Sequence, residues 1–161
     1  MRNHLLLFMA AGTLMLSSCN KPEAKTNAPS AAVDNSNTPS DNIKIEFSGM
    51  GDFVIKNPKL KVSLYGVDET LADAPATLIT EKDYEQKTVP FVIDLPVPKD
   101  AESKITPKPK GPVKYYVTVS WDSDGNGKAG EKGDIFIDYD KKFPNVKVNN
   151  ETQQVYLKIL K

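Results

Sequence analysis

The 161-residue sequence has little of the chemistry on which most enzymes rely, with one cysteine, one histidine and one tryptophan. Both His4 and Cys19 lie near the start of the chain. If that segment is cleaved before Cys19 and the thiol is modified, the remainder has no imidazole and no free thiol. This excludes the usual general base near neutral pH, Ser-His-Asp and Cys-His sites, His- or Cys-ligated zinc, and any disulfide within the chain. We therefore expect a protein that is not an enzyme, with a carboxylate-based hydrolase as the remote alternative.

Long hydrophobic runs are also missing. The run Leu5–Leu16 is about a dozen residues, whereas a membrane-spanning helix needs about 20. Arg2 precedes this run, and Leu16-Ser17-Ser18-Cys19 follows it, which is the layout of a secretory signal. Its end resembles a bacterial lipobox, in which the cysteine is acylated and becomes the first residue of the mature protein. We therefore expect a signal peptide over residues 1–18 and lipid on Cys19.

The residue after the cysteine is Asn20. In enteric lipoproteins an aspartate at this position marks retention at the inner membrane. The resemblance therefore implies an outer-membrane lipoprotein, with its folded part in the periplasm and its lipid as the membrane contact.

Residues 19–42 are rich in Ala, Pro, Ser, Thr and Asn and contain one sizeable aliphatic residue, Val33. Such a segment buries too little apolar surface to offset its ordering entropy, so we expect a disordered tether. The remaining residues, 43–161, have the size of one domain. Loss of Arg2 leaves 20 basic and 21 acidic residues, a net charge of −1. These charges are interspersed, so we expect no nucleic-acid partner.

Apolar residues alternate with polar ones along this domain, the pattern of half-buried strands. The sets that share a face are Ile43, Ile45 and Phe47; Leu60, Val62 and Leu64; Val89, Phe91, Ile93 and Leu95; Val113, Tyr115, Val117, Val119 and Trp121; Ile135, Ile137 and Tyr139; and Val155, Leu157 and Ile159. Residues 68–76 have the propensity for a single helical turn, which Pro75 limits. Short strands separated by Pro, Gly and Asn predict an all-β fold, a single antiparallel β-sandwich of seven to eight strands.

An acidic, glycine-rich loop follows the strand that ends at Trp121. Its candidate ligands for a hard cation such as calcium are Asp122, Asp124, Asn126, the backbone carbonyl of Lys128, Glu131 and Asp134. The loop departs from the EF-hand pattern, because the closing glutamate position holds Gly133 and the flanking segments are expected to be strands. Two interpretations remain open: a calcium loop that stiffens a hairpin, and a hairpin whose Asp, Asn and Gly residues serve turn chemistry alone.

Aromatic residues are mostly expected in the core or in cross-strand pairs. By alternation, however, Tyr116 and Phe136 fall on the outward faces of their strands. They could mark an exposed patch for a protein or a glycan, although cross-strand packing is the commoner explanation.

Two stretches carry a family resemblance. Residues 62–76, Val-Ser-Leu-Tyr-Gly-Val-Asp followed by Leu-Ala-Asp-Ala-Pro-Ala, and residues 89–96, Val-Pro-Phe-Val-Ile-Asp-Leu-Pro, resemble the YbaY/YscW-like bacterial lipoproteins. That family is a β-sandwich and includes type III secretion pilotins, which help an outer-membrane secretin to assemble. The loop of residues 121–134 instead resembles the hairpin of transthyretin-like periplasmic proteins. These resemblances imply an envelope accessory that binds a protein partner, with a calcium-stabilised carbohydrate- or protein-binding module as the alternative.

Overall fold

The computed structural model describes residues 40–161, and the predicted signal peptide, Cys19 and most of the tether lie outside this range. The described elements are β1 (Ser40–Gly49), β2 (Lys59–Asp68), β3 (Thr77–Glu85), β4 (Phe91–Pro98), the short 3₁₀ helix η1 (Glu102–Lys104), β5 (Val113–Trp121), β6 (Ile135–Ile137), β7 (Asn145–Val146) and β8 (Gln153–Ile159). The predicted all-β fold is confirmed. β1 begins at Ser40, so the strand includes three residues that the sequence placed in the tether.

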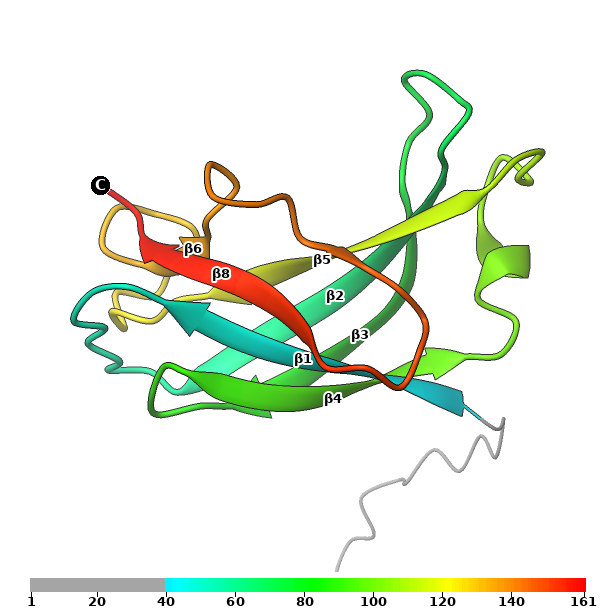
Figure 1. Cartoon of the computed structure of the whole chain (residues 1–161). Coiled ribbons are helices and arrows are strands. Elements are labelled where there is room, and N and C mark those ends of the chain that lie inside the picture. Colours follow the sequence, from blue (N-terminus) through cyan, green and yellow to red (C-terminus); the bar gives the residue numbers. More distant parts are fainter. Residues whose placement is uncertain (1–39) are drawn as a thin grey trace, which may run out of the picture. The chain divides into compact units, whose positions relative to one another are not determined.

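The strands form two four-stranded sheets that face each other (Figure 1). The first sheet has the order β4-β1-β8-β6, and the second sheet has the order β3-β2-β5-β7. Every pairing is antiparallel except that of β1 with β8, which is parallel. No hairpin joins the first and last strands, so nothing in the local chain geometry requires them to run in opposite directions.

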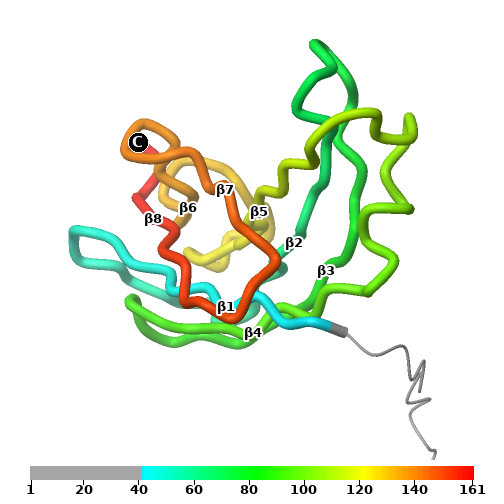
Figure 2. Tube along the Cα trace, turned by 45° about the vertical axis from the view of Figure 1, so that its right-hand side comes forward, coloured from blue at the N-terminus to red at the C-terminus, as the bar shows by residue number. Residues whose placement is uncertain are grey.

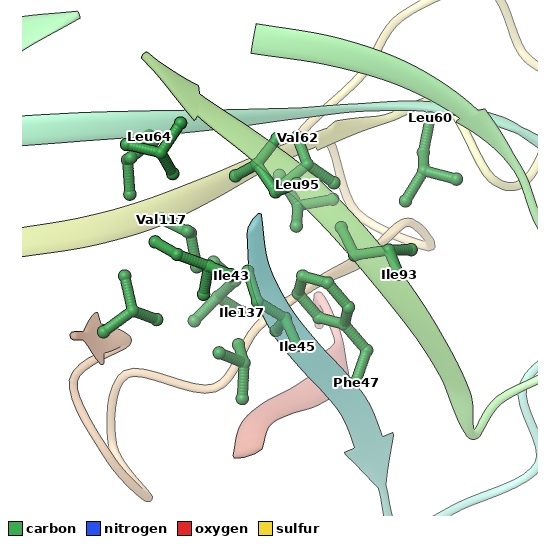
Figure 3. Close-up of a cluster of buried hydrophobic side chains, with 14 of the residues drawn as sticks. Ile43, Ile45, Phe47, Leu60, Val62, Leu64, Ile93, Leu95, Val117 and Ile137 are labelled. Carbon is green, nitrogen blue, oxygen red and sulfur yellow. The ribbon is translucent and has the colours of Figure 1, made fainter. Parts of the chain in front are cut away.

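The core lies between the two sheets and is built from the alternating sets (Figure 3). Ile43, Ile45 and Phe47 on β1 are 0% exposed. The single tryptophan, Trp121, is buried at the end of β5, and its indole N–H donates to the carbonyl of Asn57 at 2.8 Å. Full burial of an isoleucine or phenylalanine side chain, such as those on β1, contributes about 1.5–3 kcal/mol. All described strand pairings and the whole core lie within residues 40–161, which gives this range what an independently folding domain needs.

Features at the edge strands β3, β4 and β7 oppose pairing with other chains. The hydroxyl of Tyr84 on β3 donates to the carbonyl of Asp94 on β4 at 2.7 Å, and β4 carries Pro96 and Pro98. At the other side of the second sheet, the Gln153 side-chain amide both donates to the carbonyl of Lys147 and accepts from its N–H, each at 2.6 Å. That amide makes the two hydrogen bonds that another strand would make just beyond β7.

Three local expectations are wrong. The segment of residues 68–76 forms turns instead of a helical turn, and Asp73 has a positive φ of 58°, which is incompatible with one; the helical turn is η1 instead. Tyr139, expected to face inward on the strand after Ile135, lies past the end of β6 and is 39% exposed. Val89, expected in the strand with Phe91, precedes β4, which begins at Phe91 after the Val89–Pro90 bond, although its side chain does pack against the core.

Candidate functional site

The acidic loop of residues 121–134 is organised by Asp134, which is 0% exposed. One of its carboxylate oxygens accepts the backbone N–H groups of Ser123 at 2.8 Å and Asp124 at 3.3 Å, and the Ser123 hydroxyl at 3.4 Å. The other oxygen accepts the N–H groups of Gly130 at 2.9 Å and Glu131 at 3.1 Å. A carboxylate offers about four lone-pair sites, so the protein's own donors saturate Asp134.

Asp122 and Asp124 fold the tip of the loop around their side chains. Asp122 accepts the N–H of Asn126 at 2.9 Å and that of Gly127 at 3.0 Å, one on each carboxylate oxygen. Asp124 accepts the Asn126 N–H at 3.0 Å and the Asn126 side-chain amide at 3.1 Å. Gly127 has a φ of 94°, a conformation that other residues rarely adopt. These contacts are turn chemistry, and they leave lone pairs on both carboxylates.

Three of the predicted cation ligands, all of them carboxylates, form one cluster. Carboxylate oxygens of Asp122, Asp124 and Asp134 lie within 4.8 Å of one another. Glu131 instead forms an ion pair with Lys128, with 3.5 Å between the ammonium nitrogen and the carboxylate oxygen. The side-chain oxygen of Asn126 accepts the Lys128 N–H at 2.9 Å. Because Asp134 is saturated, an ion here would depend mainly on Asp122 and Asp124.

A continuous row of aromatic rings forms a second candidate site, on the outside of the sandwich. We call it the aromatic band and define it as Tyr65, Tyr116, Phe143, Tyr139 and Phe136. Successive ring centroids in this order are 5.5 to 5.8 Å apart. Tyr65 and Tyr116 are directly opposite each other on β2 and β5. The outward positions expected for Tyr116 and Phe136 are therefore confirmed, and their neighbours extend the patch.

The chain topology explains why the band crosses from one sheet to the other. Phe136 lies on β6 in the first sheet, and Tyr116 lies on β5 in the second. The chain that leaves β6 crosses to the second sheet and forms β7 there (Figure 2). Tyr139 and Phe143 project from this crossing and remain 39% and 46% exposed.

Lys114 borders the aromatic band, with its ammonium group 5.9 Å from the centroid of Phe143. Burial, and secondarily Tyr65, raises the pKa of Tyr116; burial, and secondarily Tyr116, raises the pKa of Tyr139. The two phenols therefore remain neutral donors well above physiological pH. Such a surface can hold a ligand through aromatic contact, phenol hydrogen bonds and nearby positive charge.

Periodicity does not predict the exposed positions of Phe143 and Tyr139. Phe143 stands beside Pro144 in a segment without period-two alternation, and alternation places Tyr139 in the core. The signal that could have found them is compositional, since Tyr139 and Phe143 are four residues apart in a segment between two very short strands.

Within residues 40–161, no helix has the length and apolar character needed to cross a bilayer. No protein-family model matches the chain, and no curated protein matches it. Among solved structures, the chain is similar to an alternative pilotin from the type II secretion system of Vibrio cholerae, at 19% identity and a TM-score of 0.48. That similarity covers 74% of this chain and 96% of the other. A likeness this remote assigns no function, and membership of the YbaY/YscW-like family stays a prediction.

Proposed function

We propose that the protein is a non-catalytic binding accessory of the bacterial envelope, which captures an envelope protein through the aromatic band. The observation that carries this proposal is the unbroken row of five rings on the outer surface, with Tyr139 and Phe143 39% and 46% exposed. Exposed clusters of large apolar side chains are typical of interaction sites, and tyrosine is enriched among the residues that contribute most to binding.

The amino-terminal segment supplies the second part of the proposal. Acylation of Cys19 holds the protein at the outer membrane, and the tether lets the domain reach into the periplasm by about 25–30 Å on average. Confinement to the membrane surface raises the effective concentration of the domain near a membrane-bound partner. The sequence resemblance to lipoproteins that include type III secretion pilotins makes a secretin the first partner to examine.

Site-specific photo-crosslinking in intact cells tests this function. A photoreactive phenylalanine analogue at Phe143 is expected to crosslink to one envelope protein. The matched control position is Val92 on β4, which is 52% exposed but outside the band. The proposal would be contradicted if the same protein were crosslinked at both positions, or if no envelope protein were crosslinked at Phe143. A Cys19→Ala variant tests the anchor separately: it should leave the membrane fraction, and its crosslinking yield should fall.

A calcium-stabilised binding module is the second candidate. It is favoured by one observation, the meeting of Asp122, Asp124 and Asp134 oxygens within 4.8 Å. Calcium would there stiffen the loop and would not take part in a reaction. The test is a calcium titration, described below.

A further inference from the structure

A groove with an excess of positive charge lies beside β7, next to the aromatic band. It has a volume of about 520 Å³ and is lined chiefly by Val113, Lys114, Lys142, Val146, Lys147 and Val148. Val146 is buried and Val148 is 38% exposed, so the groove combines an apolar base with lysine side chains. Lys114 also contacts the ring of Phe143, which makes the groove and the band neighbours on the surface.

The lysines of this groove have no carboxylate partner within the described range. None of the three appears in an ion pair among residues 40–161, and Glu69 is the one carboxylate in the lining. Lys158 differs, since Asp138 and Asp140 both neutralise it. The groove beside the acidic loop differs too: its charged lining residues are Lys59, Lys61, Asp83, Glu85 and Asp122, an excess of negative charge. Positive charge is therefore locally concentrated in a chain whose formal net charge is zero.

The strand edge beside the groove restricts how a ligand can bind. The Gln153 amide already hydrogen-bonds both the N–H and the carbonyl of Lys147 at 2.6 Å. Addition of a further strand at this point would require displacement of Gln153. A ligand is therefore held by its side chains, through charge and apolar contact, instead of by extending the sheet.

We infer that this groove, which we call the lysine groove, binds an acidic segment of the same partner protein that contacts the aromatic band. The inference rests on the proposed function and names the chemistry of the partner: carboxylates opposite Lys114, Lys142 and Lys147, with apolar residues between them facing Val146 and Val148. Complementary charge of this kind fixes the register of a bound segment and speeds its encounter with the surface.

A random twelve-residue peptide library, displayed on phage and selected on residues 40–161, tests the inference. Enriched peptides are expected to be acidic, with apolar residues interspersed. Their dissociation constants should rise at least tenfold in the triple variant Lys114→Glu, Lys142→Glu and Lys147→Glu, because each exposed ion pair contributes about 0.2–1 kcal/mol and reversal adds repulsion. Binding should also weaken between 0.1 M and 0.5 M salt.

The control is a triple reversal at three exposed lysines outside the groove, Lys56, Lys87 and Lys99. It changes the net charge equally and should leave peptide affinity within about twofold, while circular dichroism checks that both variants fold. Enriched peptides without acidic bias, or equal losses in both triple variants, would overturn the inference. A failure to enrich any peptide would also overturn the inference. If the domain then sediments with phosphatidylglycerol vesicles through the same lysines, the groove binds lipid and not an acidic peptide. Crosslinking at Phe143 separates these failures from failure of the proposed function, since it does not depend on the lysines.

Discussion

The ring of Phe143 meets the ring of Tyr116 at an interplanar angle of 61°, with the centroids 5.5 Å apart. Tyr116 lies on β5, whereas Phe143 lies in the segment that crosses from β6 to β7. The contact therefore fixes the crossing segment against the outer face of the second sheet. Phe143 nevertheless remains 46% exposed, so one residue both stabilises the crossing and presents an apolar surface to a partner.

Replacement of Phe143 by alanine should reduce the free energy of unfolding by about 1 kcal/mol, because aromatic pairs contribute about 0.5–1.5 kcal/mol beyond buried area. Urea unfolding of residues 40–161 measures this. The control Val92→Ala removes a side chain of similar exposure outside the band and should change stability by less than about 0.5 kcal/mol. A loss above about 3 kcal/mol for Phe143→Ala would mean that the ring is a core residue and not a surface feature.

Replacement of Asp134 by asparagine should be far more damaging. The Asp134 carboxylate accepts backbone N–H groups on both of its oxygens. An asparagine would turn its NH₂ group toward one set of these donors and leave buried N–H groups unbonded, at about 1–3 kcal/mol each. We expect a loss of about 3 kcal/mol or more in urea unfolding. The matched change Glu131→Gln removes only an exposed ion pair with Lys128 and should cost less than about 1 kcal/mol. Equal effects of the two changes would contradict this account of the loop.

Calcium distinguishes the two interpretations of the acidic loop. If the loop holds the ion with a dissociation constant near 10⁻⁴ M, a value found in extracellular modules, 10 mM calcium should stabilise the domain by about 2.7 kcal/mol. Asp122→Asn together with Asp124→Asn should abolish that gain, and the hydrogen bonds of Asp134 should persist. Calorimetric melting of the wild type and of the double variant, with and without a chelator, measures the calcium-dependent gain in stability and its loss. An unchanged melting temperature would assign the carboxylates to turn chemistry alone.

Acid should destabilise the domain partly through Asp68, which is 2% exposed at the end of β2. Hydrogen bonds from the Thr70 hydroxyl, then from the N–H groups of Lys110 and Thr70, lower its pKa from 3.8 to about 2. A carboxyl group with a lowered pKa in the folded state stabilises the fold at pH values above its pKa in the unfolded state. This contribution is therefore present above pH 4 and disappears as pH falls toward 2.

The variant Asp68→Asn should therefore be less stable than wild type at pH 7 and should lose less stability between pH 4 and pH 2. Urea unfolding across this range provides the measurement. Asp73→Asn is the control, because Asp73 is exposed and asparagine tolerates its positive φ. If both variants follow the wild-type curve, Asp68 does not make the hydrogen bonds described.

Alternation of apolar residues was enough to predict the sandwich and most of its core. One face of each of five strands packs against the other sheet, so apolar residues alternate with polar ones in their sequences; these strands are β1, β2, β4, β5 and β8. β3 was not identified, because it is an edge strand with one buried residue, Ile79, and the consecutive residues Glu81, Lys82 and Asp83 are all exposed, so apolar residues do not alternate with polar ones along it. The parallel pairing of β1 with β8 was also missed, because pairing between distant strands leaves no local pattern.

The candidate sites were predicted unequally. Asp122, Asp124 and Asp134 could be grouped from the sequence because calcium-type spacing is local, and the structure brings their oxygens within 4.8 Å of one another. That they hold an ion stays a prediction. The aromatic band joins residues from Tyr65 to Phe143, and the lysine groove joins Lys114 to Lys147. These surfaces depend on the crossing from β6 to β7, whose path no periodicity or motif determines.

Co-purification from solubilised envelopes tests the central claim, that the aromatic band is the binding surface, most directly. Tagged wild type, the double variant Tyr139→Ser and Phe143→Ser, and the control Val92→Ser would be compared by quantitative mass spectrometry at equal abundance of bait. We expect one envelope protein to be recovered with wild type and with Val92→Ser, and to fall at least tenfold with the double variant. Equal recovery of every envelope protein with all three baits would contradict the account.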